Sequence, residues 1–106
     1  MHITSDHALN RLKLSQKPFL ELFKHGTLSI EIYKPDETDH QKPHDKDEVY
    51  IIISGNGKFI NGDEIVEFGA GDFLFVPAGV HHRFIEFSND FSTWVIFYGP
   101  IAGEIN

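Results

Sequence analysis

The sequence predicts an all-β fold, a small antiparallel β-barrel made of two facing sheets, preceded by a short helix. Runs rich in β-branched and aromatic residues recur about every 8–12 residues along the second half of the chain. Turn clusters such as Ser54-Gly55-Asn56-Gly57 and Pro77-Ala78-Gly79 separate these runs. The length of 106 residues is that of one domain with one core.

The first third of the chain is less regular. Ser5 and the residues after it favour a short helix over residues 5–12, because Ser and Asp satisfy free backbone N–H groups at helix starts. Residues 18–24 and 28–34 alternate as strands around a His25-Gly26 turn. We therefore divide the chain into an N-terminal segment, residues 1–25, that carries the helix and a covering or swapped strand, and a barrel, residues 26–106.

The charged stretch over residues 35–47 has a simple interpretation as a solvated loop. Asn61-Gly62 predicts a tight hairpin, since both residues tolerate a positive φ. Trp94 and Tyr98 share one face of the last strand, and the sequence does not decide whether that face is inside or outside. The remaining strands are predicted at residues 48–53, 58–60, 64–68, 73–76, 82–87 and 91–98.

Composition excludes several classes of protein. Nine Lys and Arg against sixteen Asp and Glu give a net charge of −7, which argues against binding to nucleic acid. Without cysteine there is no disulfide framework and no thiolate metal site. No apolar run reaches the roughly 18–20 residues of a membrane span, and no signal peptide is visible, so we expect a cytoplasmic protein with no membrane partner.

Two imidazoles and a carboxylate are placed where they can converge. His44 and Glu48 lie on either side of the entry into a predicted strand, and His82 opens another strand just after a Pro-x-Gly turn. Divalent metals accept imidazole and carboxylate ligands, and three such ligands leave coordination positions open. For His82 alone, a hydrogen bond to a backbone carbonyl would be the simpler explanation.

These segments resemble the two motifs of the cupin superfamily, in particular its small single-domain members. The first motif, in words, is His, any residue, His, three or four residues, Glu, six residues, Gly. The second is Gly, five residues, Pro, any residue, Gly, two residues, His, three residues, Asn. The resemblance spans about residues 28–98, and the matching positions are His44, Glu48, Gly55, Gly71, Pro77, Gly79 and His82.

The chain departs from these motifs at two positions. Lys42 stands where the resemblance implies the first His, and Glu86 stands where it implies Asn. Lysine is a poor ligand while protonated, so the position is filled by His40, by Gln41 or by water. Of the two side chains His40 is favoured, because in an extended segment it shares the face of Lys42.

The residues around the predicted ligands include candidates for catalysis. Tyr50 shares the face of Glu48 by strand alternation, and Glu86 shares that of His82. Lys42, Tyr50 and Glu86 could orient or deprotonate a substrate, and core packing or surface exposure is the alternative for each. His81 is expected to point outward.

The resemblance implies a jelly-roll barrel with one divalent metal per chain, iron or manganese before nickel or zinc. The favoured function is an iron- or manganese-dependent dioxygenase acting on a small organic molecule. The alternatives are a Lewis-acid isomerase or lyase at the same site, a non-catalytic module that binds or senses a small ligand, and a purely structural ion. Small cupins commonly pair, so a homodimer is expected.

Overall fold

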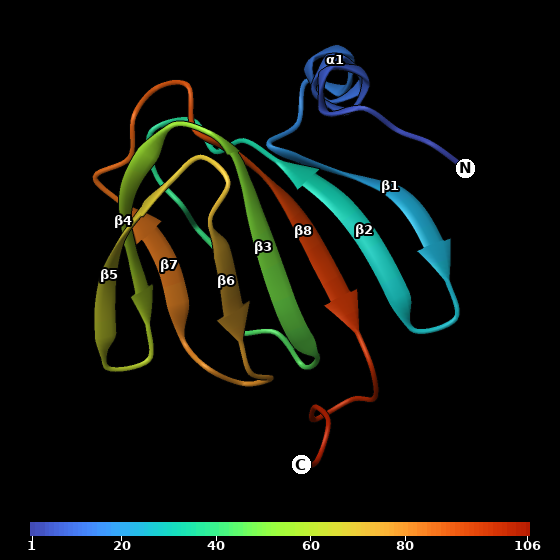
Figure 1. Cartoon of the computed structure of the whole chain (residues 1–106), viewed down its shortest axis with the longest axis vertical. Helices are drawn as coiled ribbons and strands as arrows, with labels where there is room; N and C mark the ends of the chain where they lie inside the picture. The colour runs from blue at the N-terminus through green and yellow to red at the C-terminus, as the bar shows by residue number, and fades with distance from the viewer.

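Eight strands form two antiparallel sheets that face each other, and one helix lies at one end of the larger sheet (Figure 1). A computed structural model describes all 106 residues. The elements are α1 (Ser5–Ser15), β1 (Phe19–His25), β2 (Leu28–Tyr33), β3 (Asp47–Ser54), β4 (Asn56–Asn61), β5 (Glu64–Gly69), β6 (Phe73–Val76), β7 (His82–Ile85) and β8 (Ser92–Tyr98). The predicted double-sheet barrel is therefore confirmed.

The larger sheet has the strand order β1-β2-β8-β3-β6, and the smaller has the order β5-β4-β7. Every neighbouring pair of strands is antiparallel. The last strand, β8, therefore lies at the centre of the larger sheet, between two strands from the first half of the chain.

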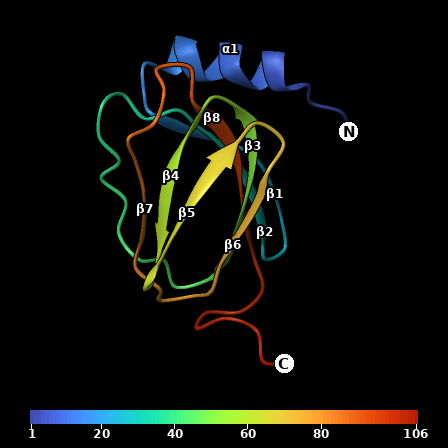
Figure 2. The ribbon, with the colours of Figure 1, turned by 60° about the vertical axis from the view of Figure 1, so that its left-hand side comes forward.

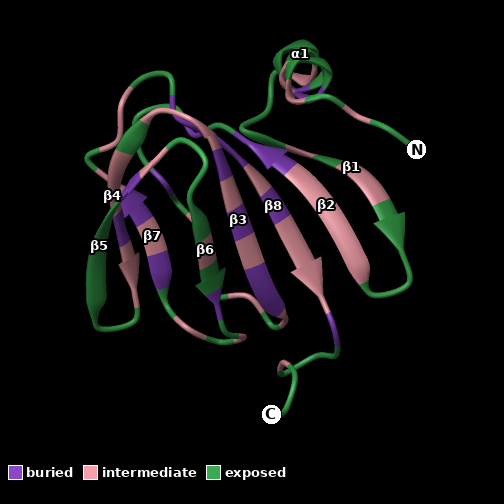
Figure 3. Ribbon diagram, viewed as in Figure 1, coloured by how far each residue is buried: buried purple, intermediate pink, exposed green.

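Alternation along β3 turns one set of side chains inward. Glu48, Tyr50 and Ile52 are buried, and the register places Glu48 opposite Phe97 of β8 and Val76 of β6. Figure 3 shows this burial as bands along β3, β8 and β7. The glutamate of the predicted site is thus carried on the side of the sheet that faces the core.

The core between the sheets is largely aromatic. Phe84 of β7 packs against Phe59 and Phe91, with 4.6 Å between ring centroids in both pairs. Burial of such rings supplies much of the stabilisation of a domain this small. The core residues are Tyr33, Tyr50, Ile52, Phe59, Phe68, Val76, Phe84, Phe91 and Val95.

Helix α1 lies above the ends of the strands (Figure 2) and packs against the outer face of the larger sheet there. It begins after Thr4, whose side chain accepts a hydrogen bond from the His7 N–H at 3.1 Å, and it continues to Ser15, beyond the predicted end. Its buried side chains pack in a cluster that includes Trp94, which places Trp94 on the outer face. With 11 residues it is too short to cross a membrane, and it is the only helix.

The N-terminal segment also supplies the edge strand β1, which pairs with β2 of the same chain. At the other end, the backbone N–H groups of Glu104 and Ala78 donate to Asp47 at 2.8 and 2.9 Å, respectively. These two bonds lower the pKa of Asp47, and the bond from Glu104 fastens the C-terminal residues to the start of β3.

Strand β7 is shorter than predicted. It ends at Ile85, and Glu86 follows with a φ of 49°, in the left-handed region. The alternation that predicts Glu86 on the face of His82 therefore stops at Phe84, which is buried as expected.

Candidate metal centre

Three side chains, one from each sheet and one from a loop, converge inside the barrel. Glu48 lies on β3, His82 is the first residue of β7, and His44 lies in the loop before β3. His82 Nε2 is 3.0 Å from Glu48 Oε1, and His44 Nε2 is 3.9 Å from Glu48 Oε2. One ligand atom from each of the three lies within 4.8 Å of the other two, so a single ion can contact all of them.

The exposure of the three side chains differs. Glu48 and His82 are completely buried, whereas the side chain of His44 is 34% exposed. The His44 ring packs edge-on against Phe97, at 4.8 Å between centroids. The site therefore has a closed inner wall and one ligand that faces outward.

The hydrogen bond of His82 leaves its second ring nitrogen free for a cation. Nδ1 is 2.9 Å from the Val80 carbonyl, which can only accept, so this nitrogen carries the proton. Nε2 of the neutral ring is then a bare lone pair. Nε2 and both oxygens of Glu48 are buried without a hydrogen-bond partner.

A cation must balance this arrangement, because facing lone pairs in a buried site repel one another. In the metal-free chain a proton is the alternative. Burial acts to lower the pKa of His82, but the contacts with Glu48 and the Val80 carbonyl outweigh it and the pKa is raised. The buried, unpartnered N and O atoms fit a divalent metal, with His44, Glu48 and His82 as its ligands.

Tyr50 is the one predicted catalytic residue that lies beside these ligands. It is buried, and its hydroxyl donates to Gln41 Oε1 at 2.7 Å. Burial and the nearby Glu48 raise its pKa well above the usual range. The Tyr50 hydroxyl is therefore a hydrogen-bond donor and not a base.

The other predicted residues do not join the cluster. His40 is exposed and lines a pocket next to His44, because the loop curls and does not stay extended. Lys42 is exposed and makes no hydrogen bond or ion pair. Glu86 is exposed and pairs with Lys58 at 3.2 Å. Their predicted roles in binding metal or in catalysis stay predictions.

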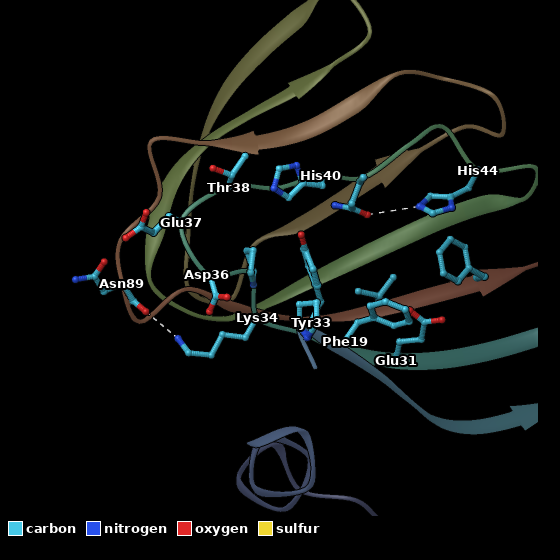
Figure 4. A pocket seen from close by; sticks show the side chains of 15 residues that line it. Phe19, Glu31, Tyr33, Lys34, Asp36, Glu37, Thr38, His40, His44 and Asn89 are labelled. Atoms are coloured by element: carbon cyan, nitrogen blue, oxygen red, sulfur yellow. Dashed lines mark hydrogen bonds between the residues drawn. The ribbon is translucent and has the colours of Figure 1, made fainter. Parts of the chain in front are cut away.

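A pocket of about 1000 Å³ opens beside the cluster, between β1, β2, β8 and the loop over residues 34–46 (Figure 4). His44 contributes to its wall, so the pocket reaches one of the three proposed metal ligands. Its walls combine the apolar Phe19, Val95 and Phe97 with charged side chains such as Glu31.

Glu31 is a functional candidate that the sequence analysis missed. It lies on β2 opposite Val95, lines the pocket and has neither a hydrogen-bond nor an ion-pair partner. Burial, followed by repulsion from Glu21 and Glu48, raises its pKa to about 7. Alternation over residues 28–33 carries the relevant signal, since it places this carboxylate on the same face as the buried Tyr33.

The comparisons with known proteins agree with this geometry. A model of the cupin domain family matches residues 29–97. An uncharacterized protein of Streptomyces coelicolor is 37% identical over 84 residues, which cover 77% of this chain and 80% of that protein.

Two solved structures show the same fold at low identity. A cupin superfamily protein of Desulfitobacterium hafniense has a TM-score of 0.65 at 18% identity, with 77% of this chain and 76% of that chain covered. The EutQ protein of Clostridium difficile has a TM-score of 0.64 at 20% identity, with 79% and 67% covered.

Proposed function

The chain belongs to the cupin family, and on that premise we propose that it is a metal-dependent enzyme acting on a small organic molecule. One observation carries the proposal. Ligand atoms of His44, Glu48 and His82 converge, those of Glu48 and His82 without hydrogen-bond partners, and His44 lines a pocket large enough for such a molecule.

Among metal-dependent reactions, we favour that of an iron- or manganese-dependent dioxygenase. His44, Glu48 and His82 would hold the ion, and two imidazoles with one carboxylate are a ligand set of non-haem iron oxygenases. When bound, the ion supplies open coordination positions and redox chemistry.

The residues of the chain would bind and orient the substrate. Phe97 and Val95 offer an apolar wall that excludes water from the side of the pocket next to His44. Tyr50 presents a protonated hydroxyl near Glu48 and fixes the loop through Gln41.

Glu31 favours a second candidate function, metal-assisted isomerisation or elimination. Such reactions need a group that takes up and returns a proton near neutral pH, and the raised pKa of Glu31 suits that task. The pocket would hold the substrate between this carboxyl group and the ion.

The test is elemental analysis of protein purified without metal-affinity resin, followed by oxygen-uptake measurements. We expect about one equivalent of iron or manganese per chain. His82→Ala should lose the ion and stay folded by circular dichroism. His81→Ala is the matched control, because His81 is the exposed neighbour and should leave the metal content unchanged.

Oxygen uptake with candidate diols, thiols or enols would support the dioxygenase. Bound metal without oxygen uptake, together with substrate isomerisation lost in Glu31→Gln, would favour the second candidate. Absence of any metal, and none taken up on titration, would overturn both and leave a small-ligand-binding module.

A further inference from the structure

The amide of Gln41 has a fixed orientation at the edge of the metal centre. Its Nε2 donates to Asp39 Oδ2 at 2.9 Å, and its Oε1 accepts from the Tyr50 hydroxyl at 2.7 Å. The Asp39 carboxylate can only accept, so a flipped amide would turn Oε1 against it and lose that bond, whereas the Tyr50 hydroxyl could pair with either amide atom. The oxygen is therefore the atom that faces the site.

Asp39 is the residue that holds this orientation. It is 3% exposed, although it lies in a charged loop. Its carboxylate accepts four hydrogen bonds, from the Tyr33 hydroxyl at 2.6 Å, the Phe84 N–H at 2.8 Å, the Gln41 N–H at 3.1 Å and the Gln41 amide. These partners belong to both sheets, so Asp39 fastens the loop to the two walls of the barrel.

The distance from Gln41 to one of the proposed ligands is close to that between two ligands of the same ion. Gln41 Oε1 lies 3.5 Å from His44 Nε2. Two ligands of one ion at about 2.1 Å are separated by about 3.0–3.4 Å in octahedral or tetrahedral geometry. Side-chain amide oxygens are established metal ligands, and the second lone pair of Oε1 remains free beside its bond with Tyr50.

We propose that Gln41 is the fourth protein ligand of the metal, through Oε1, and that Asp39 is its positioning residue. The inference rests on the metal site of the proposed function. Gln41 then takes the role of the first histidine of the cupin motif. Lys42 stands at that motif position, but its side chain is exposed. A neutral oxygen in place of a third imidazole makes the site more suitable for oxygen-preferring ions such as manganese.

Titration of the metal-free protein with Mn²⁺ tests the proposal. Gln41→Ala should weaken Mn²⁺ binding by about 10–100-fold, the range found when supporting groups of metal sites are removed. Lys42→Ala is the matched control at the neighbouring position and should bind as the unaltered chain does. Asp39→Asn should weaken binding as well, because it replaces one acceptor oxygen with a donor.

A spectroscopic readout separates coordination from support of the fold. The visible absorption of bound Co²⁺ depends on its ligands, so Gln41→His, which supplies a third imidazole, should retain the ion and change the spectrum. Gln41→Ala should also change the Co²⁺ spectrum, but not in the same way as Gln41→His, because it removes a ligand without supplying another.

Two results have distinct meanings. If Gln41→Ala is folded and leaves the Mn²⁺ affinity and the Co²⁺ spectrum unchanged, while His82→Ala abolishes binding, Gln41 is not a ligand but the site stands. If His82→Ala also binds normally, the metal site of the proposed function is wrong.

Discussion

Two glutamates face the interior of the barrel and meet different surroundings. Glu48 lies against His82, where a metal or a proton balances its charge. Glu31 has no such partner and lies on the pocket wall, opposite the apolar Val95 and beside Glu21. The difference explains why the first suits a ligand and the second suits proton transfer.

Glu31 should make the stability of the metal-free protein depend on pH. The folded chain raises its pKa from 4.5 to about 7, so the folded state holds the proton more tightly than the unfolded state does. Stability is therefore higher below about pH 4.5 and falls as the pH rises through about 7, by about 1–2 kcal/mol after allowance for partial exposure.

Glu31→Gln should remove this pH-dependent contribution to the free energy of unfolding. The measurement is the free energy of unfolding in urea at about pH 5 and pH 8, where the unaltered chain should lose more stability than the variant. Equal losses of stability in the two proteins would show that folding does not raise the pKa of Glu31.

Strand starts beside turns made His44, Glu48 and His82 candidates, and the resemblance to the two cupin motifs singled them out as ligands. Gln41 was named only as an alternative to His40, and Asp39 was missed, because their positions depend on how the loop curls against β2 and β7. A charge run read as solvated therefore contained a buried carboxylate with four hydrogen bonds.

At the scale of elements, the strands were predictable because β-branched runs end at glycine, proline and asparagine. The turn between β3 and β4 is shorter than predicted, since Gly55, with a φ of 85°, completes it almost alone and Asn56 already belongs to β4. The early end of β7 comes from the left-handed backbone at Glu86. This conformation could not be predicted, because it is uncommon for glutamate.

Gly55 should tolerate no side chain. A Cβ atom there would lie 2.6 Å from Phe91 Cα and 2.7 Å from Ser88 Oγ. We expect Gly55→Ala to cost at least about 3 kcal/mol of unfolding free energy in urea, from the clash and the strained φ together.

Gly26 supplies the matched control, because its φ is also positive, at 59°, but nothing lies within 4 Å of an added Cβ. Gly26→Ala should cost only about 1 kcal/mol. Equal costs at the two sites would mean that backbone strain alone, and not the close approach of Phe91, explains the effect.

At the scale of the whole molecule, the outer face of the larger sheet is apolar across all five strands. Strand register aligns a row of residues that carries no charge, and α1 packs beside this row without covering it. The row consists of Phe23, Ile30, Ile96, Val49 and Phe75.

We predict that a second copy covers this row in a symmetric dimer. The chain has a net charge of −7, yet pairing at this face would bury no charged side chain of the row. Phe75 is 40% exposed, and Phe75→Lys should give monomers by light scattering. Ile65→Lys, at an exposed apolar residue of the smaller sheet, should leave the dimer intact, and a monomeric unaltered chain would contradict the prediction.

The central position of β8 has a consequence for folding during synthesis. β8 forms hydrogen bonds with both β2 and β3, although it is the last strand to be made. Until it emerges from the ribosome, the two strands beside it have no partner on that side, and their open edges can pair with other chains. A chain interrupted before residue 92 would therefore yield two disconnected half-sheets and not a smaller barrel.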